Sequence, residues 1–210
     1  MSKNNDKTQR INLAVLGNSA VGKTSFILRY AEERFDNNYT PTLGIDFLIK
    51  ETISPNGEKL KIYLYDTAGQ EKFKSISLNT IKLADGIVLI YDISNQKSFE
   101  SIAEWTISIK NLPEEDYPIL LIGNKCDLIE ERIVEKNEGE EEARKNGFLF
   151  YETSNKDGTN IEESINFLIS KILEKRKTKN ENENKNKNES TNKFQLDKNK
   201  TGKRKKFCNC

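Results

Sequence analysis

A glycine-rich segment near the start of the chain, Gly17 to Thr24, has the residue types and the spacing that bind phosphate. Its letters follow the pattern G-x-x-x-x-G-K-T. Backbone N–H groups in such a turn point inward and wrap a phosphate, and the helix that follows adds the positive end of its dipole. Lys23 would reach the β- and γ-phosphates of a nucleotide, and the hydroxyl of Thr24 would bind Mg²⁺. The alternative is an ordinary glycine-rich turn that ends in Lys-Thr.

Two further segments contain groups that act on a terminal phosphate. Asp66 follows an apolar segment and can hold Mg²⁺ through water, and the N–H of Gly69 can bind a γ-phosphate. Gln70 can orient an attacking water. In the polar loop after Tyr39, Thr42 could add a hydroxyl to Mg²⁺ when a γ-phosphate is present.

Two later segments are suited to select the base. Asn124, Lys125 and Asp127 follow a buried strand. A carboxylate there can accept both N–H groups of a guanine edge, which adenine does not offer, and the wrong base would leave polar groups unpaired. The segment 153–156, Thr-Ser-Asn-Lys, follows the last strand and could close over the base. Each segment alone could be a polar loop, but their order on one scaffold predicts a common nucleotide site.

The segments between these polar loops predict an α/β domain. Apolar strands are expected at 10–16, 87–91, 119–122 and 148–151, and helices at 25–33, 78–83, 95–111, 137–145 and from 159 onward. The alternating segments 45–53 and 60–65 flank a turn and predict an antiparallel hairpin. The expected fold is a doubly wound, mostly parallel six-stranded sheet with one antiparallel edge strand. Ligands bind beyond the carboxyl ends of such strands, which is where the polar segments fall.

Composition restricts the chemistry further. The chain contains no histidine, which excludes imidazole catalysis and histidine zinc sites. Its three cysteines give no disulfide framework, as is typical of a reducing compartment. Of the 34 basic residues, 13 lie from residue 174 onward and 21 lie in the body, residues 1–173. Of the 33 acidic residues, 5 lie from residue 174 onward and 28 lie in the body. An acidic body argues against binding of nucleic acid, and a basic tail suits an anionic surface.

Both ends of the chain are polar. Residues 1–9 lack the apolar core of a signal peptide and are expected to be disordered. Asn, Lys and Glu dominate residues 175–207, which predicts a disordered Asn/Lys-rich tail with a polybasic end. Cys208 and Cys210 follow four basic residues, and their terminal position favours lipidation over a solvated tail.

From residue 10 to 174 the chain resembles a small GTPase of the Ras superfamily, and the Rab branch fits best. Leu43 to Phe47 is similar to the Rab stretch I-G-V-D-F, and 89–93 is similar to L-V-Y-D-I. The end Cys208-Asn209-Cys210 is similar to the Rab C-x-C motif, on which both cysteines carry geranylgeranyl groups. The resemblance implies a P-loop small G domain that binds GTP or GDP with Mg²⁺. It also implies slow hydrolysis of GTP, because no arginine of the chain is obviously placed to neutralise charge on the phosphates.

The motifs and the resemblance together assign roles to named residues. The nucleotide-binding residues are Ser19, Ala20, Val21, Gly22, Lys23, Thr24, Ser25, Phe35, Tyr39, Thr42, Gly69, Asn124, Lys125, Asp127, Ser154, Asn155 and Lys156. The catalytic residues are Gln70, Lys23 and Thr42, and the metal ligands are Thr24, Thr42 and, through water, Asp66. The effector surface comprises Leu43, Gly44, Ile45, Asp46, Phe47 and Tyr65. By resemblance, the edge of Phe35 stacks on the guanine and Lys125 packs along the ring and the sugar.

The resemblance also implies partners and a location. The expected partners are an exchange factor for guanine nucleotides, a GTPase-activating protein, a GDP dissociation inhibitor, the prenylation escort machinery and effector proteins. We expect a monomer that regulates vesicle traffic, cycling through its lipid anchor between the cytosol and the cytoplasmic face of an intracellular membrane.

The chain departs from the Rab pattern at four positions. Tyr65 stands where Rabs usually have tryptophan, and Thr80 replaces one aromatic of the trio that contacts effectors. Ala20 stands where Rabs generally have glycine, and its methyl group could alter nucleotide exchange. Asn155 stands where they generally have alanine.

Three other functions remain to be weighed. A non-hydrolysing nucleotide-bound scaffold is opposed by Gln70, Thr42 and Asp66. A Ras-like signalling switch outside membrane traffic would have a C-a-a-X end, which this chain lacks. An ATP-using P-loop kinase is opposed by the segment 124–127.

Overall fold

The computed structural model describes residues 8–35, 45–54, 57–67, 81–112 and 117–201. The chain divides into two compact units, Met1–Ser170 and Lys171–Cys210. The first unit contains the whole sheet. Half of the helix predicted at 78–83, residues 78–80, lies outside the described residues.

Six strands form a single sheet in the order β2-β3-β1-β4-β5-β6. They are β1 (Gln9–Leu16), β2 (Ile45–Ile53), β3 (Lys59–Thr67), β4 (Gly86–Asp92), β5 (Ile119–Asn124) and β6 (Leu149–Thr153). The edge strand β2 runs antiparallel to β3, and the other neighbouring strands are parallel. The predicted sheet, including its antiparallel edge strand, is therefore confirmed.

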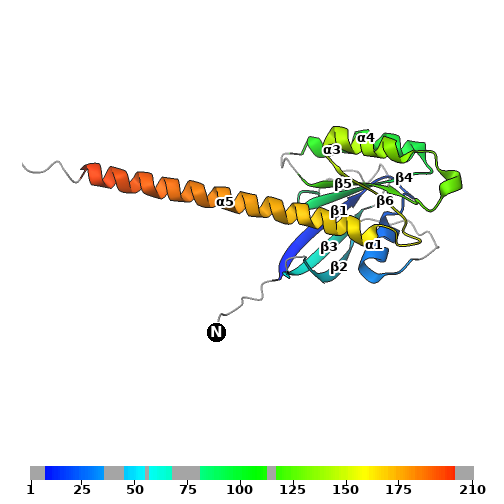
Figure 1. Cartoon of the computed structure of the whole chain (residues 1–210), viewed down its shortest axis with the longest axis horizontal. Coiled ribbons are helices and arrows are strands. Elements are labelled where there is room, and N and C mark those ends of the chain that lie inside the picture. The colour runs from blue at the N-terminus through cyan, green and yellow to red at the C-terminus, as the bar shows by residue number, and fades with distance from the viewer. Residues whose placement is uncertain (1–7, 36–44, 55–56, 68–80, 113–116, 202–210) are drawn as a thin grey trace, which may run out of the picture. The chain divides into compact units, whose positions relative to one another are not determined.

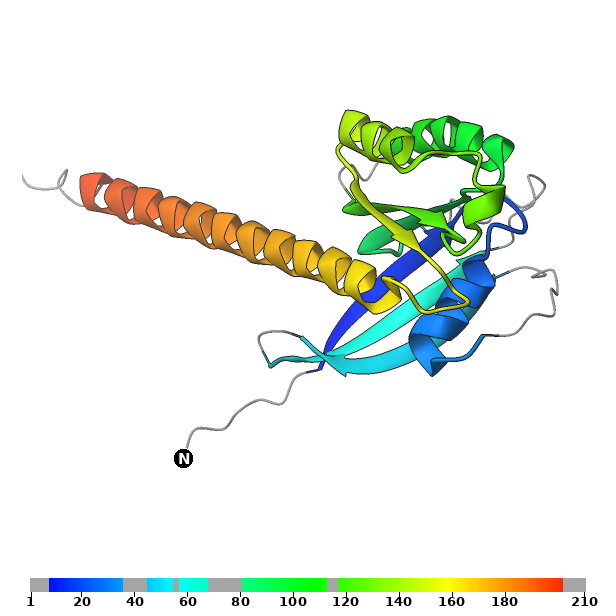
Figure 2. The ribbon, with the colours of Figure 1, turned by 45° about the vertical axis from the view of Figure 1, so that its right-hand side comes forward.

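Helices cover both faces of the sheet. They are α1 (Lys23–Glu32), α3 (Gln96–Lys110), α4 (Lys136–Asn146) and α5 (Ile161–Thr201), with a short 3-10 helix η2 at Ile129–Glu131. Within the first unit, α3 and α4 lie on one face, and α1 and the start of α5 lie on the other (Figure 1, Figure 2). This arrangement explains why the central strands are apolar on both faces, since neither face meets water.

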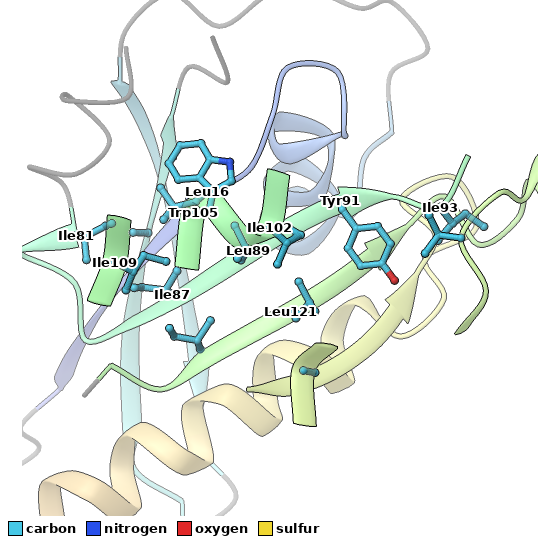
Figure 3. Packing of buried hydrophobic residues seen from close by; sticks show 14 residues of the cluster. Leu16, Ile81, Ile87, Leu89, Tyr91, Ile93, Ile102, Trp105, Ile109 and Leu121 are labelled. Carbon is cyan, nitrogen blue, oxygen red and sulfur yellow. The ribbon is translucent and has the colours of Figure 1, made fainter. Parts of the chain in front are cut away.

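The pleat of β4 divides its side chains between two cores. Ile87, Leu89 and Tyr91 belong to the core on the α3 side, together with Trp105 and Leu121. Figure 3 shows these side chains gathered between the strands and α3. The residues between them in the sequence, Val88 and Ile90, are also fully buried, and alternation along a strand places them on the opposite face. Each face thus has its own apolar layer, which fixes the register of the strand.

Helix α5 is longer than the sequence predicts. The composition from residue 175 predicts a disordered tail, whereas the structure continues α5 as a helix to Thr201. No glycine or proline interrupts Ile161–Thr201, and its many lysines and glutamates have good helix propensity, so the backbone meets no residue that ends a helix. Among the described residues, no helix is both long enough and apolar enough to cross a bilayer.

Candidate functional site

The register of the sheet brings the predicted polar segments to one edge. Val15, near the end of β1, is paired with Asp66 on one side and with Val88 on the other. On the far side of β4, Asp92 is paired with Asn124, and Asn124 is paired with Thr153. The carboxyl ends of five strands therefore meet, and the loops that leave them share one site.

The loop after β1 needs glycine at two positions. Gly17 has φ +139°, and a Cβ there would lie 2.2 Å from the carbonyl oxygen of Ile90. Gly22 has φ +98°, and a Cβ there would lie 2.4 Å from Nδ2 of Asn124. Ala20 also adopts a left-handed conformation, with φ 63°. A residue with a Cβ is disfavoured in this conformation, so alanine strains the loop where glycine would not.

The side chain of Lys23 is buried inside this loop. It is only 6% exposed, and its Nζ donates a hydrogen bond to the carbonyl oxygen of Asn18 at 2.7 Å. Burial lowers the pKa of Lys23 from 10.5 to about 8, and the negative charge of Asp66 opposes that shift in part. A buried ammonium group attracts a polyanion strongly, because no water screens it.

Two oxygen ligands lie together beside Lys23. The hydroxyl of Thr24 donates a hydrogen bond to Oδ2 of Asp66 at 2.6 Å. Asp66 is placed by β3, where the hydroxyl of the next residue, Thr67, donates to the carbonyl oxygen of Val15 at 2.7 Å. A hydroxyl and a carboxylate are the hard oxygen donors that Mg²⁺ prefers, so this pair fits the predicted metal site.

The amide of Asn124 links the base-selecting loop to the phosphate loop. Its Nδ2 donates to the carbonyl oxygen of Val21 at 2.8 Å, and its Oδ1 accepts from the hydroxyl of Thr153 at 3.2 Å. Asn124 is fully buried, so its amide is held in one orientation by these partners.

The carboxylate and the lysine of the 124–127 segment are also held in place. Oδ1 of Asp127 accepts a hydrogen bond from the hydroxyl of Ser154 at 2.7 Å. Nζ of Lys125 lies 2.5 Å from Oδ2 of Asp92 at the end of β4. The 124–127 segment is thereby held against the loop after β6 and against the end of β4. The carboxylate of Asp127 keeps further acceptor capacity for a ligand.

Asn155 and Lys156 are connected to α1. The carbonyl oxygen of Asn155 accepts from Nε of Arg29 at 2.9 Å, and that of Lys156 accepts from Nη2 of the same arginine. The side chain of Asn155 donates from Nδ2 to the carbonyl oxygen of Gly22 at 2.9 Å. The loop after β6 therefore contacts both the phosphate loop and the helix that follows it.

Other predicted residues are exposed or half-buried, or lie outside the described residues. Ser19 and Ala20 are exposed, and Ser25 and Phe35 are half-buried. Tyr39, Thr42, Gly69 and Gln70 lie outside the described residues, as do Leu43, Gly44, Thr80, Cys208 and Cys210.

The predicted effector surface is described in part. Phe47 is 51% exposed on β2, and its ring centroid lies 6.0 Å from that of Tyr65 and 6.4 Å from that of Tyr63. The hydroxyl of Tyr65 accepts from Nη2 of Arg10 at 3.0 Å, and the guanidinium of Arg10 lies over the ring of Tyr63. The strands thus bring Phe47 and Tyr65 together, and Tyr63 and Arg10 lie beside them.

Sequence reasoning missed several residues that hold the site. Oδ1 of Asn18 accepts from Nε1 of Trp105 at 3.1 Å, and Nδ2 of Asn18 donates to the hydroxyl of Ser101 at 2.8 Å. These bonds tie the phosphate loop to α3. Asp92 could have been found from its place at the end of a buried strand, but no local pattern indicates the contacts of Trp105 or Arg29.

Known proteins resemble this chain over the same region. Residues 12–174 match the Ras family. The chain is 42% identical over 163 residues to Ras-related protein Rab-13 of Canis lupus familiaris, which covers 78% of this chain and 80% of the relative. It is 40% identical over 163 residues to Ras-related protein Rab-3A of Homo sapiens, which covers 78% of this chain and 74% of that protein.

Proposed function

This chain belongs to the Ras family of small GTPases, within its Rab branch, and from that premise we propose how its residues bind and hydrolyse GTP. The protein is a GTPase that converts GTP to GDP, and it is a Rab-type switch in vesicle traffic. It binds GTP or GDP with Mg²⁺, and its partners comprise exchange factors, GTPase-activating proteins, GDP dissociation inhibitors and effectors.

We assign the G domain to residues 10–174 and the choice of base to Asp127. One observation carries this proposal: the buried amide of Asn124 joins the 124–127 loop to the phosphate loop, while Ser154 holds the carboxylate of Asp127 at 2.7 Å. The carboxylate would accept both N–H groups of a guanine edge, and adenine would leave it unpaired. Lys125 and Phe35 would pack against the base, and Ser154 and Lys156 would support it.

The polyphosphate would lie on the N–H groups of the loop from Ser19 to Ser25. Lys23 would contact the β- and γ-phosphates, because its buried ammonium group is held at the centre of that loop. Thr24 and, through water, Asp66 would hold the magnesium ion, with Thr42 joining them in the GTP state. The bound ion neutralises negative charge on the phosphates.

Hydrolysis requires few covalent contributions from the protein. The oxygen of a water attacks the γ-phosphorus, the bond to the β–γ bridging oxygen breaks, and GDP leaves with the bonding electrons. The proton of the water passes to the released phosphate. We assign the orientation of this water to Gln70, and a stabilising N–H to Gly69. Loss of the γ-phosphate would release Thr42 and Gly69, so the two loops that carry them would relax.

The tail would anchor the protein. Two geranylgeranyl chains on Cys208 and Cys210 would bind a membrane stably where one chain would be marginal, and the basic residues 203–206 would add attraction to an anionic leaflet. This anchor would require the prenylation escort machinery, and would place the monomeric protein on the cytoplasmic face of an intracellular membrane. Cell fractionation tests it, since replacing both cysteines by serine should leave the protein wholly in the soluble fraction.

Release of phosphate tests the catalytic proposal. The wild-type protein loaded with GTP should release phosphate slowly in a single turnover, and Gln70→Leu should be slower still. A Gln70→Leu rate equal to that of the wild type would remove Gln70 from the mechanism. Absence of phosphate release from a wild-type protein that binds GTP would instead support a non-hydrolysing scaffold.

A further inference from the structure

Two successive carbonyl groups of the phosphate loop bind side-chain amides from different base-binding loops. The carbonyl oxygen of Val21 accepts from Asn124 at 2.8 Å, and that of Gly22 accepts from Asn155 at 2.9 Å. Asn124 is fully buried and Asn155 is 5% exposed, so neither bond competes freely with water. Asn155 stands at a position where Rabs generally have alanine. Alanine has no side-chain amide and could not donate this hydrogen bond to Gly22.

The two amides orient the N–H groups that would face a phosphate. A trans peptide bond is planar, so its C=O and the following N–H point in opposite directions. The carbonyl of Val21 points toward Asn124, so the N–H of Gly22 points away from Asn124. In the same way, the carbonyl of Gly22 points toward Asn155, so the N–H of Lys23 points away from Asn155. The Gly22 carbonyl also accepts from the N–H of Phe26 at 2.9 Å, so Asn155 adds to the hold of α1 on the same group.

The two polar atoms of the Asn155 side chain differ in their hydrogen bonding. Its Oδ1 is buried and, among the residues that the structure describes, has no hydrogen-bond partner. A buried acceptor without a partner is unfavourable, and an alanine would avoid that penalty. Among the described residues, the hydrogen bond that Nδ2 donates to the carbonyl oxygen of Gly22 is the polar contact with which this side chain can offset that penalty. The carbonyl oxygen of Asn155 accepts a hydrogen bond from Arg29, so the backbone that carries this side-chain amide is fixed.

We propose that Asn155 is a positioning residue that ties the base-binding loop to the phosphate loop and slows the release of bound guanine nucleotide. The inference rests on the nucleotide site proposed above. While the bond is intact, the loop that covers the base and the loop that holds the phosphates move as one unit, so both must open together for the nucleotide to leave.

The test measures how fast a fluorescent GDP leaves the full chain. The protein is loaded with N-methylanthraniloyl-GDP and magnesium, excess unlabelled GDP is added, and the release rate is followed. Asn155→Ala should release about 2- to 10-fold faster than the wild type, the range that corresponds to one net hydrogen bond. Asn155→Asp has the same shape but places an acceptor against the Gly22 carbonyl, so it should release faster than Asn155→Ala.

Asn146→Ala is the matched control. Asn146 also donates from Nδ2 to a backbone carbonyl, that of Glu142 at 3.0 Å, but it lies at the end of α4 away from the phosphate loop. Its variant should release GDP at the wild-type rate. The unfolding temperature in saturating GDP shows that each variant is folded, and a merely structural role would lower that temperature without changing the release rate.

Two failures are distinguishable in this experiment. If the wild type binds no labelled GDP, the proposed nucleotide site is wrong, and this is seen before any variant is compared. If the wild type binds GDP but both Asn155 variants release it at the rate of Asn146→Ala, or more slowly, the role assigned to Asn155 is overturned.

Discussion

Replacing Gly22 by alanine should break the connection between the base-binding loops and the phosphate loop. A Cβ at this position would lie 2.4 Å from Nδ2 of Asn124 and 2.7 Å from Nδ2 of Asn155, so both amides would have to move. Each lost hydrogen bond is worth about 1 kcal/mol. A non-glycine residue at φ +98° adds strain of about 1–2 kcal/mol. Together these terms lower the unfolding free energy of the GDP-bound protein by on the order of 3 kcal/mol.

Urea unfolding of the GDP-loaded protein measures this loss, with Gly147→Ala as the matched control. Gly147 has φ +74°, but a Cβ there would meet nothing within 4 Å, so only the strain of about 1–2 kcal/mol applies. The additional loss of unfolding free energy in Gly22→Ala over Gly147→Ala measures the contribution of the Asn124 and Asn155 amide bonds. GDP release should accelerate in Gly22→Ala alone. Equal losses in the two variants, with unchanged GDP release, would refute the reasoning.

Two further predictions concern buried charges. Burial lowers the pKa of Lys23 to about 8 in the nucleotide-free protein, and a bound polyphosphate would raise this pKa again. The protein should therefore take up roughly 0.7 proton when it binds GDP at pH 8.5 and roughly 0.1 proton at pH 7. Calorimetry in buffers of different ionisation enthalpy measures this uptake. The unfolded lysine keeps its proton up to its pKa of 10.5, so the contribution of Lys23 to the unfolding free energy of the nucleotide-free protein should rise from pH 8 to 10.5. It is measured as an increase with pH in the unfolding free energy of the wild type relative to Lys23→Met. Arg132→Ala should lower the unfolding free energy by about 2–3 kcal/mol in urea, because it leaves the mostly buried carboxylate of Glu152 without the two bonds of 2.7 and 2.9 Å that Arg132 donates. Lys145→Ala, which removes an exposed ion pair with Glu142, should change it by less than about 1 kcal/mol, and larger losses there than in Arg132→Ala would contradict this ranking.

The sheet could be predicted from the sequence because its signals are local. The run Ile87 to Tyr91 is apolar throughout and becomes β4, which helices cover on both faces. The alternation at 45–53 and 60–65 becomes the antiparallel pair β2 and β3. Because the polar segments that begin at Gly17, Asp66, Asn124 and Thr153 come at the ends of strands, the sequence also predicts which of these loops meet at the carboxyl edge.

The contacts that hold the site could not be predicted in the same way. Asn155 bonds to Gly22 across 133 positions of the chain, and Trp105 bonds to Asn18 across 87. Such pairs depend on how α3 and the loop after β6 pack against the phosphate loop, and no spacing in the sequence encodes that. The length of α5 could not be predicted from the sequence for another reason: the polar composition predicts disorder, whereas the absence of glycine and proline lets a helix continue.

The central claim is that the loops at the carboxyl edge of the sheet form one site selective for guanine nucleotides. The most direct test is to denature the purified full chain, identify the nucleotide that it releases, and then compare GTP with ATP as competitors for bound labelled GDP in the presence of Mg²⁺. The account predicts about one guanine nucleotide per chain and a preference for GTP over ATP of at least about 10⁴-fold, because Asp127 would have no partners on adenine. A protein that carries no guanine nucleotide, or from which ATP displaces GDP as readily as GTP does, would contradict it.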